Sequence, residues 1–148
     1  LWGICAVKAW IAYSIYSFQG KNDLAYATSA EALQIADKSG DIYSKSHAYF
    51  THGWSNYFKG YMQEAKELFL KGADASEKIR LTGGIELTQL GLGFTYFDMG
   101  EYRKSQENFE KSVSWARKEK RSSRLKFVYI LIQVSFHMDT YLKFDINR

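Results

Sequence analysis

The chain of 148 residues contains no proline and a single cysteine, Cys5. Because proline is the residue that most strongly interrupts a helix, its absence leaves glycine to end helices and to form turns. A single cysteine excludes an intramolecular disulfide and a zinc site built from several cysteines. These absences favour a helical protein that is stabilised by packing and not by covalent or metal cross-links.

Long hydrophobic runs and a strong charge bias are also missing. No stretch reaches the roughly 18 consecutive apolar residues of a membrane span, so we expect no membrane insertion. The formal net charge is +4 with both signs interspersed, which is typical of a solvated surface. The first residues contain neither a basic leader nor an initiator methionine. We therefore expect a piece of a longer protein and a cytoplasmic location.

Three glycines stand 40 residues apart, at Gly20, Gly60 and Gly100. Each follows an aromatic-rich stretch and precedes a second periodic stretch. A fixed period of this size indicates one structural unit that is repeated. The whole chain, 1–148, is then a single array with the units 1–40, 41–80, 81–120 and a partial fourth unit, 121–148.

Each unit has the periodicity of two antiparallel helices joined at its glycine. First helices are expected over 2–19, 42–59, 82–99 and 123–139. Second helices are expected over 22–37, 62–79 and 102–118. The glycines should adopt the left-handed conformation that ends a helix, and the fourth turn should fall at Thr140.

Small residues recur after each glycine, and large ones recur between them. The small set is Ala25, Ala65 and Ser105, followed by Ala32, Gly72 and Ser112. Small side chains at fixed helical positions let two helices approach closely, and Phe69 and Phe109 would fill the remaining space.

With these residues the pattern resembles the tetratricopeptide repeat. The third unit matches best, through Leu92, Gly93, Tyr96, Gly100, Tyr102, Ser105, Phe109 and Ser112. The first unit departs from the motif, with Tyr13 where a small residue is usual and Ser29 where a large one is. The period of 40 also exceeds the family's usual 34 residues and is similar to the longer units of bacterial signalling and regulatory proteins. The resemblance implies an all-α superhelix, or solenoid, of about three and a half antiparallel helix pairs.

The resemblance also implies that the first helices line a concave, partner-binding groove. The family's groove positions fall on Trp10, Phe18, Phe50, Trp54, Tyr57, Phe58, Leu90, Phe94, Phe97 and Phe127. Such an apolar set suits a protein or peptide partner, or a neighbouring domain, and implies a non-enzymatic scaffold. The alternative is that these aromatics are core, and that the chain is a structural spacer or self-association segment without a separate ligand.

Other candidate sites are weaker. A basic run, comprising Arg117, Lys118, Lys120, Arg121, Arg124 and Lys126, could contact phosphates, but cations at a helix end also stabilise the helix dipole. We favour the second interpretation and do not expect nucleic-acid binding. The three histidines lack metal-binding spacing, so we expect no catalysis, metal or cofactor. The apolar helix expected over 123–139 predicts a homo-oligomer through that helix.

Overall fold

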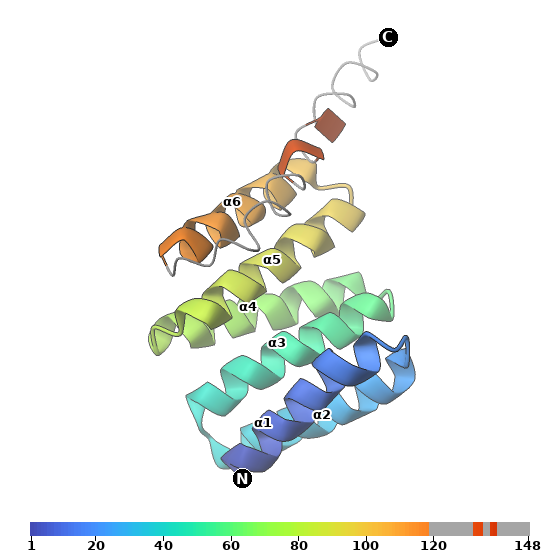
Figure 1. Ribbon diagram of the computed structural model, residues 1–148, viewed down its shortest axis with the longest axis vertical. Helices are drawn as coiled ribbons and strands as arrows, with labels where there is room; N and C mark the ends of the chain where they lie inside the picture. The colour runs from blue at the N-terminus through green and yellow to red at the C-terminus, as the bar shows by residue number, and fades with distance from the viewer. Residues whose placement is uncertain (119–131, 135–136, 139–148) are drawn as a thin grey trace.

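The computed structural model describes residues 1–118, 132–134 and 137–138. Within these ranges every element of regular secondary structure is a helix, which confirms the all-α prediction (Figure 1). The elements are α1 (Trp2–Ile11), the π-helix η1 (Ala12–Ser17), α2 (Asn22–Ser39), α3 (Ile42–Phe58), α4 (Met62–Lys78), α5 (Thr82–Asp98) and α6 (Tyr102–Lys118). The expected fourth-unit helix over 123–139 lies largely outside the described residues, as does Thr140.

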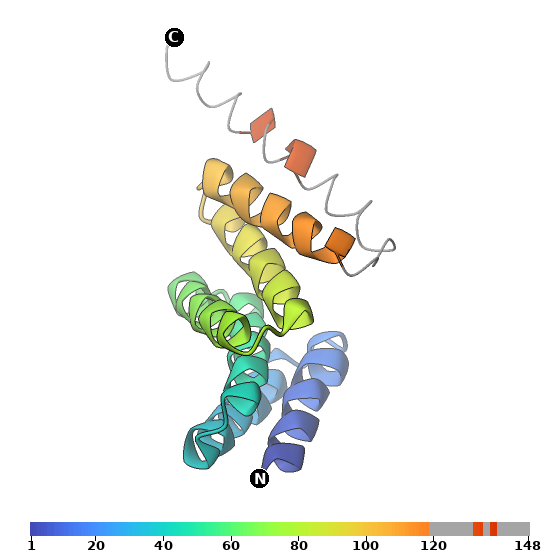
Figure 2. The same cartoon turned by 90° about the vertical axis from the view of Figure 1, so that its left-hand side faces the viewer.

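The described helices stack as consecutive antiparallel pairs. Helices α1 and η1 pack on α2, α3 packs on α4, and α5 packs on α6. The first helices also contact one another in series, α1 with α3 and α3 with α5, and they lie on one side of the stack (Figure 1). The turned view shows successive pairs rotating about the long axis (Figure 2). The described part of the chain is therefore a helical solenoid.

The glycines end the first helices as the period predicts. Gly20, Gly60 and Gly100 have φ angles of 70°, 81° and 76°, in the left-handed region. Glycine has no Cβ to clash in this conformation, so the chain can reverse within a short turn. Between the first and second pairs, Gly40 has a φ angle of 68°. The corresponding turn between the second and third pairs places Arg80 at φ 53°, a conformation that costs energy for a residue with a side chain.

The close approach inside the second and third pairs is made by a glycine facing a phenylalanine. A Cβ atom added at Gly93 would lie 2.4 Å from Cδ1 of Phe109, and one at Gly53 would lie 2.8 Å from Cε1 of Phe69. Both phenyl rings are completely buried. The predicted small residues are buried as well: Ala25, Ala65, Ser105, Ala32, Gly72 and Ser112. The packing prediction is thus confirmed for the second and third pairs.

The first pair differs because its first helix widens into the π-helix η1. An α-helix was expected over 2–19, and that prediction is wrong from Ala12 to Ser17. Because the π-helix contains an extra residue, Ala12 takes the fully buried position at which the repeat placed Tyr13. Tyr13 turns instead towards Phe50, with ring centroids 5.0 Å apart. The departures from the repeat motif in the first unit therefore have a structural cause.

Ser29 occupies the place that phenylalanine takes in the later pairs. Its Oγ lies 2.8 Å from Nδ1 of His52, and both residues are buried. The His52 ring packs on Tyr26 with centroids 5.0 Å apart. Burial lowers the pKa of His52 to about 4, so the imidazole is neutral at pH 7. A neutral hydrogen-bonded pair thus joins the first and second repeats in place of an aromatic ring.

Candidate partner-binding surface on the first helices

An open cavity of about 280 Å³ lies where α1, α3 and the start of α5 meet. It is lined by Trp10, Tyr43, Ser46, His47, Phe50, Thr51, Leu81, Gly83, Gly84 and Leu87. Every lining residue except Leu81 belongs to a first helix, and Leu81 immediately precedes α5. The cavity therefore occupies the side of the array on which the resemblance places a groove.

Aromatic rings form the wall of this cavity. The Trp10 ring meets the His47 ring edge to face at a centroid distance of 6.2 Å, and the Tyr43 and His47 ring centroids lie 4.5 Å apart. Burial lowers the pKa of His47 below its usual value, which keeps the ring neutral at pH 7. Trp10 remains 43% exposed, so the wall is open to an incoming group.

Two hydroxyl groups that line the cavity are already hydrogen-bonded within the protein. Thr51 Oγ1 donates to the carbonyl oxygen of His47 at 3.0 Å, and Ser46 Oγ lies 2.6 Å from Ser76 Oγ. None of the described residues that line the cavity carries a charge at neutral pH. Because these two hydroxyls have partners and the other lining residues are mostly apolar or aromatic, the cavity offers an occupant mainly apolar contact.

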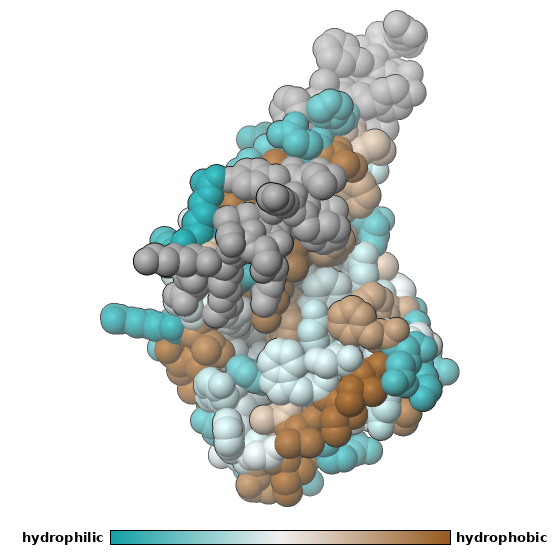
Figure 3. Space-filling model, viewed as in Figure 1, coloured by the Kyte–Doolittle hydropathy of each residue, from teal (hydrophilic) through white to brown (hydrophobic). Residues whose placement is uncertain are grey.

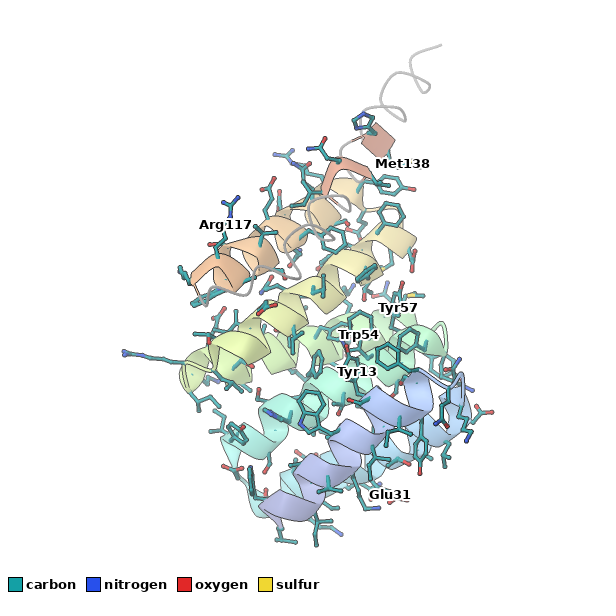
Figure 4. All side chains as sticks on the ribbon, viewed as in Figure 1. Tyr13, Glu31, Trp54, Tyr57, Arg117 and Met138 are labelled. Atoms are coloured by element: carbon teal, nitrogen blue, oxygen red, sulfur yellow. The ribbon has the colours of Figure 1, made fainter. Side chains whose placement is uncertain are left out.

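Two of the predicted groove residues belong to the core instead. Phe50 is 5% exposed and Trp54 is 7% exposed, so neither forms an open surface as predicted, although Phe50 still lines the cavity. The Trp54 ring packs on Phe94, Phe58 and Phe69 at centroid distances of 5.8, 5.6 and 5.5 Å. Figure 4 shows Trp54 between Tyr13 and Tyr57 in the middle of the stack. Neighbouring first helices lie close enough to cover these two side chains.

The other predicted groove residues are partly or fully accessible. Phe18 and Phe58 are exposed by 78% and 42%. The half-buried set is Tyr57, Leu90, Phe94 and Phe97, and Phe127 lies outside the described residues. The structure thus divides the predicted set between core and surface.

Tyr57 connects α3 to α5 through its side chain. Its hydroxyl donates to Oδ2 of Asp98. Burial, together with this carboxylate acceptor, raises the pKa of Tyr57. The phenol is therefore neutral and held in place, which fixes the relative position of the two first helices.

The remaining candidates are surface or structural features. Arg117 (Figure 4) and Lys118 lie in the last turn of α6. The Lys118 ammonium stands 4.1 Å from the Trp115 ring centroid. The rest of the basic run, Lys120, Arg121, Arg124 and Lys126, lies outside the described residues. Cys5 is buried, and burial raises the pKa of its thiol, so it is a poor nucleophile.

The described residues contain neither a candidate metal-binding cluster nor a candidate membrane-spanning helix. In ranges 1–118, 132–134 and 137–138, no group of three or more His, Cys, Asp or Glu side chains could hold a metal ion. Among the helices in the same ranges, none combines the length and the apolar character needed to cross a membrane.

The sequence prediction missed several lining residues. Trp10 and Phe50 were predicted, whereas Tyr43, Leu81 and Gly84 were not. The 40-residue period offers a signal for part of the set, because His47 and Leu87 are equivalent positions one unit apart. Gly84 carries no such signal, since its closeness to Ser76, 2.4 Å from an added Cβ to Oγ, depends on how the repeats stack.

Stacked helix pairs whose first helices share a hollowed face define an α-helical repeat protein of the solenoid class. Residues 88–119, which span most of α5 and all of α6, match the family model described as tetratricopeptide repeat. The comparison thus supports a tetratricopeptide repeat at residues 88–119. No curated protein matches the sequence.

A solved structure has the same fold. The chain is similar to a signal transduction ATPase with numerous domains (STAND) protein with a tetratricopeptide repeat sensor, from Pyrococcus horikoshii. The TM-score is 0.75 at 20% sequence identity, and the match covers 92% of this chain. It covers 21% of the other protein, so the chain spans about a fifth of that protein's length.

Proposed function

We propose that the chain is a protein-interaction module that binds an apolar side chain of a peptide or of a neighbouring domain in the cavity between α1, α3 and α5. Tetratricopeptide repeats are non-enzymatic units that mediate contacts between proteins. The observation that carries the proposal is the uncharged, aromatic-walled cavity with Trp10 at its rim. An occupant would gain apolar burial there without burying a charged group of the cavity wall.

The size of the cavity supports a side chain as the occupant. Its volume of about 280 Å³ is just below the roughly 300–1,000 Å³ of sites that bind small molecules. Space of this kind suits one large apolar side chain, with the rest of the peptide lying along the exposed rim. Central apolar anchors of this type supply most of the binding energy in protein interfaces.

The place of the module in its parent protein is also a proposal. The similar Pyrococcus horikoshii protein is described as carrying its tetratricopeptide repeats as a sensor. By analogy, this chain would be the part of a larger signalling protein that recognises a segment of its partner. The cytoplasmic location expected from the sequence stays a prediction.

Selection from a random peptide library displayed on phage tests the binding proposal. The matched variants are Leu87→Trp, which fills the cavity from a half-buried position, and Leu70→Trp, which adds the same ring to an exposed position on α4. Both variants should keep the wild-type circular dichroism spectrum and melting temperature. We expect the selected peptides to share one Leu, Ile, Phe or Trp anchor.

The two variants should differ in peptide affinity if the cavity is the binding site. Leu87→Trp should weaken binding of a selected peptide at least tenfold, which corresponds to about 1.4 kcal/mol, and Leu70→Trp should leave it unchanged. Equal binding by both variants would place the site elsewhere. A selection that yields no apolar anchor would favour the spacer alternative.

A further inference from the structure

One described side chain of the cavity wall can gain a charge near neutral pH. Of the described residues that line the cavity, only His47 and Tyr43 titrate, and a phenol gains no charge in acid. The His47 ring packs on the rings of Trp10 and Tyr43, at centroid distances of 6.2 and 4.5 Å. On the face of the stack drawn in Figure 3, the hydrophobic band of α1 borders paler side chains, and strongly hydrophilic ones lie mainly towards the edges. Protonation of His47 would therefore place a charge in an uncharged wall.

The imidazole of His47 has no hydrogen-bond partner within the part of the chain that the structure describes. The other buried histidine differs, because Nδ1 of His52 lies 2.8 Å from Oγ of Ser29. Neither ring nitrogen of His47 is among the fully buried described atoms that lack a partner, and the ring lines an open cavity. Solvent, and not the protein, therefore supplies the hydrogen bonds of this ring.

The charges of the neighbouring helices do not reach His47. Burial is the cause of its lowered pKa, and no charged group of the described residues contributes to it. Lys8 of α1 pairs with Glu31 of α2 at 2.6 Å, and Lys45 of α3 pairs with Asp37 of α2 at 3.6 Å. Helices α1 and α5 contribute only uncharged residues to the described lining, and α2 and α4 contribute none. Solvation of the ring, and not a neighbouring ion, therefore governs its protonation.

The repeat does not require a histidine at this position. Leu87 holds the equivalent position one unit later, and it lines the same cavity. An apolar side chain therefore satisfies the packing of a first helix there. The imidazole is a feature of the cavity and not of the fold.

An apolar occupant would change the surroundings of this ring. A side chain that fills the cavity displaces solvent from His47 and brings neither a charge nor a hydrogen bond in exchange. Because loss of solvent disfavours the charged form, the bound state should hold the His47 proton less tightly than the free state. Of two states, the one that binds fewer protons is weakened as the pH falls.

We propose that His47 makes binding in the cavity depend on protons: the site accepts its apolar anchor while the imidazole is neutral and loses affinity when acid protonates it. This inference rests on the function proposed above and adds a form of regulation to the same site.

The dependence of peptide affinity on pH tests this inference. The probe is a library-selected peptide whose binding Leu87→Trp weakens, with blocked termini and without His, Asp or Glu, so that it does not itself titrate. We expect its affinity for the wild-type chain to fall at least about twofold between about pH 7.5 and 5, because the bound state binds fewer protons. Circular dichroism at both pH values should show the same helical content.

Two variants and one spectroscopic measurement assign the effect. His47→Leu copies the residue of the third repeat and should bind the peptide equally well at both pH values. His137→Gln is the matched control, because His137 is exposed and does not line the cavity, and it should keep the wild-type loss of affinity. In the wild-type chain, the midpoint of the His47 titration followed by NMR should lie at lower pH when the peptide is bound.

Three results would overturn the inference. They are a wild-type affinity that is equal at the two pH values, an equal loss of affinity in His47→Leu, and a His47 titration midpoint that the peptide leaves unchanged or raises. A chain that binds no such peptide even at the higher pH would overturn the proposed function as well. Binding in the cavity that does not depend on pH would overturn this inference alone.

Discussion

Replacing Gly93 with alanine probes the packing that defines each repeat. The added Cβ would lie 2.4 Å from both Cδ1 and Cε1 of Phe109 and 2.9 Å from its Cγ. These atoms include Cγ, the ring atom bonded to Cβ of Phe109, so a small rotation of the side chain does not relieve the clash. Phe109 is also completely buried, and its ring meets Phe94 edge to face at 5.4 Å. The ring therefore has little room to move.

Two opposing effects set the magnitude. Alanine is a better helix former than glycine by about 1 kcal/mol, which stabilises the variant. Overpacking a rigid core costs about 1–3 kcal/mol, and contacts this short place Gly93→Ala at the upper end of that range. The net loss should be about 2 kcal/mol. For a chain of this size, that loss lowers the melting temperature by about 4–8 °C.

Thermal unfolding monitored by circular dichroism checks this prediction. Gly3→Ala is the control, because an added Cβ there meets no atom within 4 Å. It should leave the melting temperature unchanged or raise it slightly. If Gly93→Ala melts at or above the wild-type temperature, the proposed contact between the first and second helices of the pair is wrong.

Three further predictions concern stability. Arg80→Gly should stabilise the chain by about 1 kcal/mol, seen as a higher urea midpoint, because glycine adopts the left-handed conformation at φ 53° without strain; an unchanged midpoint would contradict this. Trp54→Ala should cost about 3–5 kcal/mol in chemical denaturation, because it empties a core position; a loss below 1 kcal/mol would mean that Trp54 is not core. The free energy of unfolding should also fall by on the order of 3 kcal/mol as the pH drops from about 6.5 to 4. In the unfolded chain His52 binds a proton below about pH 6.5, whereas in the folded chain its pKa is about 4, so acid favours the unfolded state over this range. His52→Gln should flatten this part of the pH profile of the urea midpoint, and a profile equal to that of the wild type would assign the effect to other groups.

Much of the fold could be predicted because glycine marks its turns. A left-handed residue is needed wherever one helix reverses into the next, and Gly20, Gly60 and Gly100 reveal both the period and the helix ends. The π-helix could not be predicted in this way. No residue between Ala12 and Ser17 has a strong preference for it, and the wider turn satisfies the packing of Ala12 against α2.

The candidate site was harder to predict than the helices. Its side of the array follows from the family pattern, because that pattern specifies which positions the first helices present. Whether an aromatic residue on that side is core or surface depends on how closely neighbouring first helices pack. Trp54 and Phe58 are four residues apart on α3, yet Trp54 is 7% exposed and Phe58 is 42% exposed. Such a difference arises from the winding of the array and is not encoded in local spacing.

Nuclear Overhauser effects between the chain and a library-selected peptide test the central claim most directly. The account predicts contacts from the peptide's apolar anchor to the Trp10 ring, the His47 ring and the Leu87 methyl groups, all at the cavity. They should disappear in Leu87→Trp. Contacts confined to the outer helices α2 and α4, or to Val7 on α1, would contradict the cavity as the binding site.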